Sequence, residues 1–452
     1  MNKLSFILAT GDFFLVVVSY YVALLLRYGG LPEGIFRTTL NLEQVGVMAI
    51  VFLLSSTVFE LYSRHRSLDR TRLITRILVA LGVSFVGLSS VFYLVPELTV
   101  GRGVLCLALA LFGVCQYLWH CYSSFLFRIP GFNQRCMIVG VGDMAKEVAE
   151  VIKEAPGNLT LVGFIQPEGV EVKVDPEMII GMIESLPESA VRERVGKIIV
   201  ALTERRGVMP YKELLNCRFS GIEVIDAITF YEKVTGKLKV KDINPDWFIF
   251  SNGFSFGHLI CFVKRVVDII LALVGIIVTL PIMPLIALAI KLESPGDVLF
   301  SQVRVGEYGR EFKIYKFRSM RQDAEIGGGP VWAQEDDPRI TRVGRFLRKT
   351  RLDELPQLFN VLLGNMSLVG PRPERPEFVC QLDQQIPYYG KRHTLKPGVT
   401  GWAQVRFPYG ASVEDSLMKL EYDLYYIKNF SLLFDLKIIL ETIRVVLFGK
   451  GR

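Results

Sequence analysis

"KRVVDIILALVGIIVTLPIMPLIALAIK", from Lys264 to Lys291, is the stretch that decides how this chain meets a lipid bilayer. As a straight helix, its apolar run Val266–Ile290 would be about 37 Å long, which is enough to cross a membrane. Pro281 and Pro284 predict a bent helix, because neither residue can donate a hydrogen bond to the carbonyl four positions earlier. Two shapes therefore fit: a kinked helix that crosses, or a re-entrant helix that returns to the side it came from.

The kink leaves polar groups that need partners. Carbonyls freed by the two prolines, those of Ile277 and Leu280, cannot be bonded by water inside hydrocarbon. We expect the Thr279 hydroxyl to contribute at this point. A crossing helix would move everything after it across the membrane, whereas a re-entrant helix, at about residues 263–292, would not. The choice depends on what chemistry the downstream residues perform.

Four further apolar stretches open the chain, each close to the roughly 20 residues that a membrane span needs. An arginine-rich loop separates the second from the third, which predicts that this loop and both ends of the four-span region face the cytoplasm. The first stretch lacks a signal-peptide cleavage pattern and contains Asp12, which we interpret as structural rather than functional. The stretches are Leu4–Leu26, Val45–Tyr62, Leu73–Val95 and Val104–Phe127, and the loop arginines are Arg64, Arg66, Arg70, Arg72 and Arg76.

The composition agrees with a membrane protein. Hydrophobic residues make up 51% of the chain, which is high for a soluble domain. The net charge of +7 suits anionic lipid head groups or phosphorylated substrates, and no basic patch interleaved with aromatic residues predicts nucleic-acid binding. The seven cysteines and four histidines are scattered, so they indicate neither a disulfide framework nor a metal-ligand motif.

The middle of the chain has the pattern of a Rossmann-like α/β domain. "RCMIVGVGDMAKEVAEVIKE", starting at Arg135, is typical of a strand, a glycine-rich turn and an amphipathic helix, and two more apolar strands follow. Gly140, Gly142 and Ala145 have the spacing that lets backbone N–H groups approach a pyrophosphate, so they are candidate nucleotide-binding residues. Because Gln166 stands where a dinucleotide site normally has an acid, a regulatory or structural role is an equal alternative.

"TRLDELPQLFN" places two carboxylates, Asp353 and Glu354, side by side. Neighbours on a helix diverge by about 100°, so the two acids could do different jobs at one site. The alternative is a solvated helix start with acids near the positive end of the dipole. Nearby cations could bind phosphate oxygens, arginine in a bidentate manner, or could instead pair with surface acids. These cations are Lys316, Arg318, Arg348, Arg372 and Arg406.

Several motifs occur together in the second half: "KFRSM", "LDELPQLFNVL", "SLVGPRP" and "PGVTGWAQV". In this order they resemble the catalytic domain of the bacterial polyprenyl-phosphate sugar-1-phosphate transferases, the monotopic phosphoglycosyl transferases. The whole chain resembles the large members of that family. The resemblance implies a membrane α/β protein with four transmembrane helices (1–130), a Rossmann-like middle domain (131–255) and an α-rich catalytic domain (256–452). It also favours the re-entrant form of the bent helix.

The resemblance also implies a mechanism. Asp353 would attack the β-phosphate of a nucleotide-diphosphate sugar, such as a UDP-sugar, and release UMP, leaving a phosphosugar on the carboxylate. Polyprenyl (undecaprenyl) phosphate would then take the phosphosugar, while Glu354 would position groups or transfer a proton. Mg²⁺ would contact Asp353 and the diphosphate. Since an aspartate is already ionised at neutral pH it needs no base, but it does need cations such as Arg348 and Arg372 beside an anionic substrate.

The chain departs from the family pattern in two places. The family has a serine before the kink proline, whereas this chain has Leu280 before Pro281, so Thr279 is the candidate substitute. After "GWAQV" the family often has Asn-Gly-Arg, whereas this chain continues Arg406-Phe-Pro-Tyr-Gly. Arg406 is therefore the candidate for the third phosphate-binding arginine.

We therefore expect a multi-pass protein of the bacterial inner membrane, with its middle and catalytic domains on the cytoplasmic side, that starts an exopolysaccharide, O-antigen or capsule. Its partners would be the sugar donor, polyprenyl phosphate and the bilayer, and a homodimer stays open. The C-terminal segment would lie on head groups or pack on the catalytic core. One alternative function is a non-catalytic scaffold that senses nucleotides through Gly140–Ala145. Another is a nucleotide-sugar dehydratase, whose Tyr-x-x-x-Lys pair is absent between Cys136 and Phe262.

Overall fold

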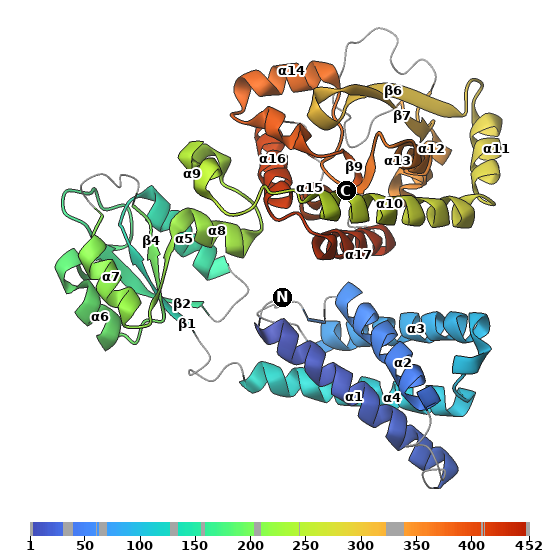
Figure 1. Cartoon of the computed structure of the whole chain (residues 1–452), viewed down its shortest axis with the longest axis horizontal. Helices are drawn as coiled ribbons and strands as arrows, with labels where there is room; N and C mark the ends of the chain where they lie inside the picture. The colour runs from blue at the N-terminus through green and yellow to red at the C-terminus, as the bar shows by residue number, and fades with distance from the viewer. Residues whose placement is uncertain are drawn as a thin grey trace. The chain divides into compact units, whose positions relative to one another are not determined.

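The computed structural model divides into two compact units, Met1–Ala227 and Ile228–Arg452 (Figure 1). The first unit holds the apolar helices and the α/β sheet, and the second holds the bent helix and the carboxylate pair. The described residues are 3–29, 39–59, 61–62, 70–126, 134–154, 159–202, 209–243, 245–321, 339–407, 410 and 412–448.

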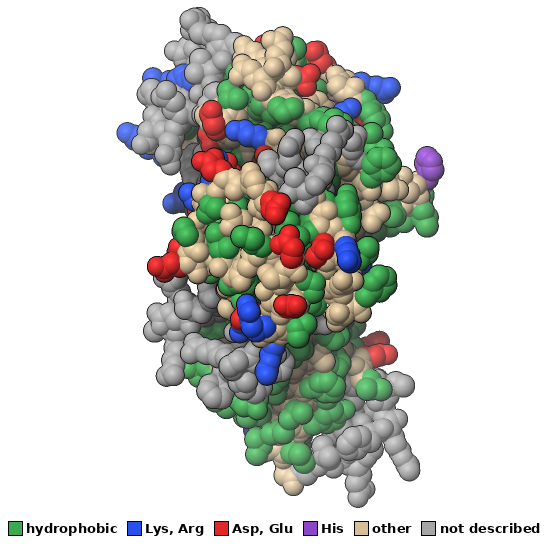
Figure 2. Space-filling model, turned by 90° about the vertical axis from the view of Figure 1, so that its left-hand side faces the viewer, with side chains coloured by type: hydrophobic (Ala, Val, Ile, Leu, Met, Phe, Trp, Pro, Cys, Tyr) green, Lys and Arg blue, Asp and Glu red, His purple; other side chains and the backbone are tan. Residues whose placement is uncertain are grey.

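Four apolar helices open the first unit. They are α1 (Lys3–Tyr28), α2 (Thr39–Val58), α3 (Arg70–Leu94) and α4 (Arg102–Leu126). Within the described residues, α1, α3 and α4 are long and apolar enough to cross a membrane, whereas the apolar part of α2, Leu42–Val58, is shorter. Figure 2 shows hydrophobic side chains over much of the surface at the bottom of the view, where these helices lie. Three of the four predicted apolar helices are therefore confirmed as long enough to span a membrane, and the span at Val45–Tyr62 stays a prediction.

Asp12 lies fully buried inside this helix bundle. The Tyr62 hydroxyl donates to Asp12 Oδ2 over 2.8 Å, and the Gln116 amide nitrogen donates to the same oxygen. His120 Nε2 is 3.4 Å from that oxygen. Because α4 provides two of these partners and α1 provides the acid, the contacts hold the two helices together and support a structural role.

The rest of the first unit is a parallel five-stranded sheet in the order β3-β2-β1-β4-β5, with helices in the connections. This finding confirms the predicted parallel α/β fold. The apolar run Cys136–Val139 in β1 is completely buried at the centre of the sheet. The elements are β1 (Gln134–Val139), α5 (Asp143–Glu154), β2 (Leu159–Gln166), β3 (Ile179–Met182), α6 (Leu186–Arg192), β4 (Lys197–Val200), α7 (Tyr211–Phe219) and β5 (Glu223–Asp226).

The second unit is rich in helices and contains two small sheets, an antiparallel β6–β7 pair and a parallel β8–β9 pair. Its helices are α8 (Ala227–Thr235), α9 (Pro245–Phe250), α10 (His258–Thr279), α11 (Met283–Glu293), α12 (Arg342–Thr350), α13 (Gln357–Leu363), α14 (Pro376–Gln385), α15 (Trp402–Arg406), α16 (Val413–Lys428) and α17 (Leu432–Phe448). Its strands are β6 (Leu299–Val305), β7 (Glu311–Phe317), β8 (Ser367–Val369) and β9 (Gly398–Thr400).

Helices α10 and α11 form the predicted bend, with an angle of 60° between them. The break falls at Leu280–Ile282, around Pro281, and Pro284 lies in the first turn of α11, where a missing N–H costs nothing. The Thr279 hydroxyl donates to the Gly275 carbonyl over 2.7 Å, one turn back in its own helix. Its described bonds therefore do not reach the carbonyls freed by the prolines. The re-entrant path through a membrane stays a prediction.

Residues just before α10 pack with the apolar core around Trp402. Leu238 and Val240 are buried in one cluster with Trp402, whose indole nitrogen donates to the Gly236 carbonyl over 2.7 Å. Ile438 of α17 is completely buried in the same cluster, so the C-terminal helix packs on this core. The three-domain division stays a prediction, and these contacts show that the segment preceding α10 belongs structurally with the helices and strands after α10.

Candidate active site

The carboxylate pair lies on a single 3₁₀ turn, Leu352–Glu354, between α12 and α13. Thr341 caps the N-terminus of α12, where its side chain accepts a bond from the Gly344 backbone, and Arg351 caps the C-terminus. Arg351 has a left-handed conformation with φ of 59°, which turns the chain sharply into the pair. Asp353 and Glu354 are each only 7% exposed, so they are not acids of a solvated helix start.

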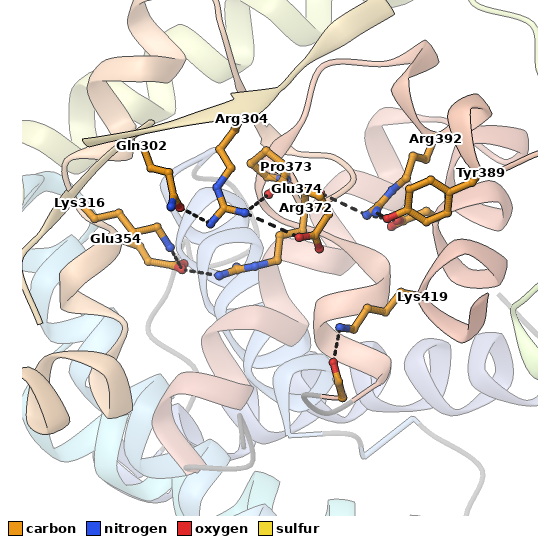
Figure 3. A network of polar contacts seen from close by, with 12 residues as sticks. Gln302, Arg304, Lys316, Glu354, Arg372, Pro373, Glu374, Tyr389, Arg392 and Lys419 are labelled. Atoms are coloured by element: carbon orange, nitrogen blue, oxygen red, sulfur yellow. Dashed lines mark hydrogen bonds and ion pairs between the residues drawn. The ribbon is translucent and has the colours of Figure 1, made fainter. Parts of the chain in front are cut away.

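Glu354 is surrounded by cations from three parts of the chain, and Figure 3 shows two of them, Lys316 and Arg372. Its Oε1 accepts from Lys316 Nζ of β7 over 2.9 Å and from Arg372 Nη2 over 3.1 Å. Arg351 lies 3.9 Å from Oε2. Burial alone would raise the pKa of Glu354, but the three cations together hold it well below its usual range. Glu354 is therefore ionised and keeps Lys316 and Arg372 in place.

Asp353 is in a different electrostatic position. Its Oδ1 is buried and has no hydrogen-bond partner among the described atoms. Burial, followed by the negative charge of Glu354, raises the pKa of Asp353, although Lys316, Arg348 and Arg372 act in the opposite direction. Two adjacent carboxylates thus differ: one is paired with cations, and the other has an oxygen available for bonding elsewhere.

Two arginines, the buried Arg392 and the half-buried Arg304, fix the turn that carries Arg372. Arg392 donates to the Arg372 carbonyl over 3.1 Å and to Asp423 over 2.7 Å. Arg304 of β6 donates to the Pro373 carbonyl over 3.2 Å. Figure 3 shows these guanidinium groups on either side of the turn. Because both hold backbone atoms, Arg372 projects toward Glu354 from a rigid base.

Lys316 is fixed in a comparable way. Asn360 of α13 is buried, and its side chain bonds the backbone of β7 twice: Oδ1 accepts from the Tyr315 N–H over 3.1 Å, and Nδ2 donates to the Lys313 carbonyl over 2.7 Å. These bonds tie the strand that carries Lys316 to the helix that follows the carboxylate pair. Burial lowers the pKa of Lys316, against the influence of Glu354.

The structure places the remaining predicted cations differently. Arg348 Nε donates to Ser319 Oγ over 2.9 Å, close enough to Asp353 to act on it electrostatically. Arg318 is buried and donates to the carbonyls of Ser294 and Pro295, just after α11. Arg406 instead donates to Glu441 of α17 over 3.1 Å. Its guanidinium carbon also lies 4.4 Å from the centre of the Trp402 ring. The phosphate-binding roles of all three stay predictions.

Two of the three small residues at the glycine-rich turn of the α/β sheet are closely packed. Gly140 has a φ of +130°, and a Cβ there would lie 2.4 Å from the Ala201 carbonyl oxygen at the end of β4. Gly142 leads into α5, where Ala145 is completely buried. Close packing accounts for Gly140 and Ala145 without a ligand. Their nucleotide-binding role stays a prediction.

The site also suits Mg²⁺ shared with a substrate. Among the described residues, no group of three or more metal-ligating side chains occurs. Mg²⁺ usually keeps several waters and binds one or two carboxylates together with substrate phosphates. The Asp353 carboxylate, one oxygen of which is buried and unpartnered among the described atoms, is a ligand of that kind. The donor set therefore fits an ion that binds with a diphosphate rather than alone.

Comparison with known proteins identifies the family. Residues 259–449 match the family described as bacterial sugar transferase. The chain is 31% identical over 460 residues to the UDP-glucose:undecaprenyl-phosphate glucose-1-phosphate transferase of Xanthomonas campestris, covering 96% of this chain and 92% of the relative. The chain belongs to the bacterial sugar transferase family. The predicted likeness to polyprenyl-phosphate sugar-1-phosphate transferases, and with it the phosphoglycosyl transferase class, is confirmed.

Other relatives of this sugar transferase agree. It is 36% identical over 327 residues to the Escherichia coli UDP-glucose:undecaprenyl-phosphate glucose-1-phosphate transferase, covering 70% of this chain and 68% of the relative. It is 46% identical over 243 residues to the Aeromonas hydrophila UDP-N-acetylgalactosamine-undecaprenyl-phosphate N-acetylgalactosaminephosphotransferase. That match covers 53% of this chain and 55% of the relative. The names agree on the lipid acceptor and differ in the sugar.

Proposed function

We propose that this sugar transferase moves a sugar-1-phosphate from a UDP-sugar to undecaprenyl phosphate through a phosphosugar intermediate on Asp353. The observation that carries the proposal is the asymmetry of the buried pair: Glu354 is bonded to Lys316 and Arg372, while Asp353 Oδ1 has no described partner. The relatives named above act on UDP-sugars and undecaprenyl phosphate, which supports these substrates.

The reaction consists of two displacements at one phosphorus atom. In the first, Asp353 Oδ1 forms a bond to the β-phosphorus while the bond to the bridging oxygen breaks, and that oxygen leaves with UMP. In the second, an oxygen of undecaprenyl phosphate bonds to the same phosphorus and the Asp353 carboxylate is released. Lys316 and Arg372, held by Glu354, stabilise charge on the phosphoryl oxygens throughout. Mg²⁺, when bound through Asp353, would supply further positive charge.

The intermediate can be trapped. Purified full-length protein incubated with Mg²⁺ and UDP-glucose or UDP-N-acetylgalactosamine, but no lipid, is expected to release about one UMP per enzyme molecule and to stop. Mass spectrometry should then find a sugar phosphate on the peptide containing Asp353. EDTA should prevent both events. Product accumulation with an unmodified peptide would refute the intermediate, and the absence of UMP release from every UDP-sugar tried would refute the transfer.

The membrane arrangement follows from the same proposal. Since nucleotide sugars are cytosolic, we infer that the α10–α11 bend is re-entrant, that four helices precede it as spans, and that the catalytic residues face the cytoplasm of a bacterial inner membrane. A protease cleavage site inserted after Lys291 is therefore expected to stay uncut when protease is added to intact spheroplasts, and to be cut once the membrane is permeabilised. Cutting in intact spheroplasts would mean that the helix crosses.

The product would start a surface polysaccharide. A relative that is 44% identical over 194 residues is an exopolysaccharide production protein of Rhizobium leguminosarum. We infer that the chain performs the first membrane step of exopolysaccharide, O-antigen or capsule assembly. A gene deletion that leaves all three glycans intact would contradict this role.

A further inference from the structure

A small hollow adjoins the carboxylate pair on the side of Glu354. It is lined by Arg304, Ile314, Lys316, Gln357, Arg372 and Pro373. Two of the three cations in this lining, Lys316 and Arg372, are the ones bonded to Glu354. The third, Arg304, lies 3.7 Å from Glu374. The lining therefore carries three cationic side chains, two of which contact Glu354, the residue next to the proposed reacting group.

Gln357 contributes the unusual feature of this hollow. It is the first residue of α13, four positions after Asp353, and its side chain is only 2% exposed. Its amide nitrogen Nε2 is buried and has no hydrogen-bond partner among the described atoms. Burying such a donor without a partner opposes folding, so a buried unpaired amide calls for an explanation.

The surroundings of this amide indicate what would satisfy it. Neighbouring cations can only donate hydrogen bonds, so they cannot serve the amide nitrogen as acceptors. An entering anion would accept from the amide and at the same time meet the positive charge of Lys316 and Arg372. A sugar hydroxyl could accept a hydrogen bond from the amide, but because it is uncharged the three cations would stabilise it little. A phosphoryl oxygen fits both conditions.

We propose that this hollow is a phosphoryl-oxygen subsite for the donor diphosphate, in which Gln357 Nε2 donates to a non-bridging oxygen. The assignment rests on the proposed function, because it places the diphosphate against Lys316 and Arg372 with its β-phosphorus near Asp353. Gln357 is then a substrate-binding residue that distinguishes a diphosphate from the uncharged parts of the donor.

Two substitutions separate this role from a structural one. Gln357→Leu removes the donor at similar volume, and Gln357→Glu replaces it with a carboxylate that would face and repel the phosphate. In detergent-solubilised full-length protein, titration calorimetry with UDP is expected to show about 10-fold weaker binding for Gln357→Leu and about 100-fold weaker binding for Gln357→Glu. Uridine, which has no phosphate, should bind all variants equally. The melting temperature of Gln357→Glu should be unchanged or higher, because the new carboxylate meets cations.

Gln384→Glu is the matched control, because Gln384 is exposed on α14 and the substitution introduces the same charge. It should leave UDP affinity unchanged.

Titration with UMP distinguishes the two phosphates. If the Gln357 variants lose affinity equally for UMP and UDP, the hollow binds the α-phosphate. If they lose affinity for UDP alone, it binds the β-phosphate. Unchanged UDP affinity in both folded Gln357 variants overturns the subsite, as does an equal loss for uridine. Absence of transfer by the unsubstituted protein refutes the proposed function, whereas the titrations still decide the subsite.

Discussion

Asp353→Asn protein is expected to release UMP at least about 10⁴-fold more slowly than the unsubstituted protein, because an amide cannot form the bond to phosphorus. The same variant should be more stable. Burial and the charge of Glu354 raise the pKa of Asp353, so its ionised form is less favourable in the folded state than in the unfolded state. This cost appears as the pH rises above the ordinary aspartate pKa and grows up to the raised pKa of the folded state, and asparagine avoids it.

The measurement is UMP release from a UDP-sugar together with a thermal melt in detergent. We expect the melting temperature of Asp353→Asn to rise by about 2–4 °C for each kcal/mol recovered. Glu377→Asn is a suitable control, since Glu377 is an exposed acid on α14. Normal turnover by Asp353→Asn would favour the scaffold hypothesis instead. A lower melting temperature would show that the Asp353 charge stabilises the fold.

Glu354→Gln should have the second largest effect. A neutral amide cannot hold Lys316 and Arg372 as a carboxylate does, and we expect the maximal rate of UMP release to fall by about 10²- to 10⁴-fold. Removing the negative charge also removes one cause of the raised pKa of Asp353. Since Asp353 must be ionised to attack, the rate rises with pH through that pKa, and in the variant this rise should occur at lower pH.

A pH profile of the first turnover measures this displacement directly. Glu377→Gln provides the control for loss of a carboxylate without a change at the site. A rise at the same or higher pH in Glu354→Gln would mean that the two carboxyl groups are not coupled by charge. A lower maximum with the predicted displacement would show that Glu354 both tunes its neighbour and positions the cations.

Much of the fold follows from local pattern. The strand–turn–helix periodicity from Arg135 onward predicts the parallel sheet, and the two prolines predict the bend of 60° between α10 and α11. The adjacency of Asp353 and Glu354 is visible in the sequence, yet their difference in partners is not. That difference depends on Lys316 and Arg372, which come from separate segments and meet only in the folded chain.

The supporting residues show where sequence reasoning ends. Arg304, Arg392 and Gln357 were not predicted, because their roles depend on backbone atoms or space provided by distant segments. One signal was available for Gln357, namely its position one helical turn after Asp353. Arg318 illustrates a second limit: its motif predicts phosphate binding, which stays a prediction, while the structure adds that its guanidinium donates to backbone carbonyls just after α11. A charge in a motif does not reveal whether its partner is substrate or backbone.

The packing of the segment before α10 bears on how the enzyme can be dissected. The family match begins at residue 259, yet Leu238 and Val240 complete the apolar core around Trp402, and the Leu238 N–H donates to the Glu421 carbonyl over 3.0 Å. A catalytic fragment cut at the match boundary would expose that indole and leave the carbonyl without its donor. An autonomous minimal enzyme should therefore retain the chain from residue 228, about thirty residues upstream of the recognisable domain.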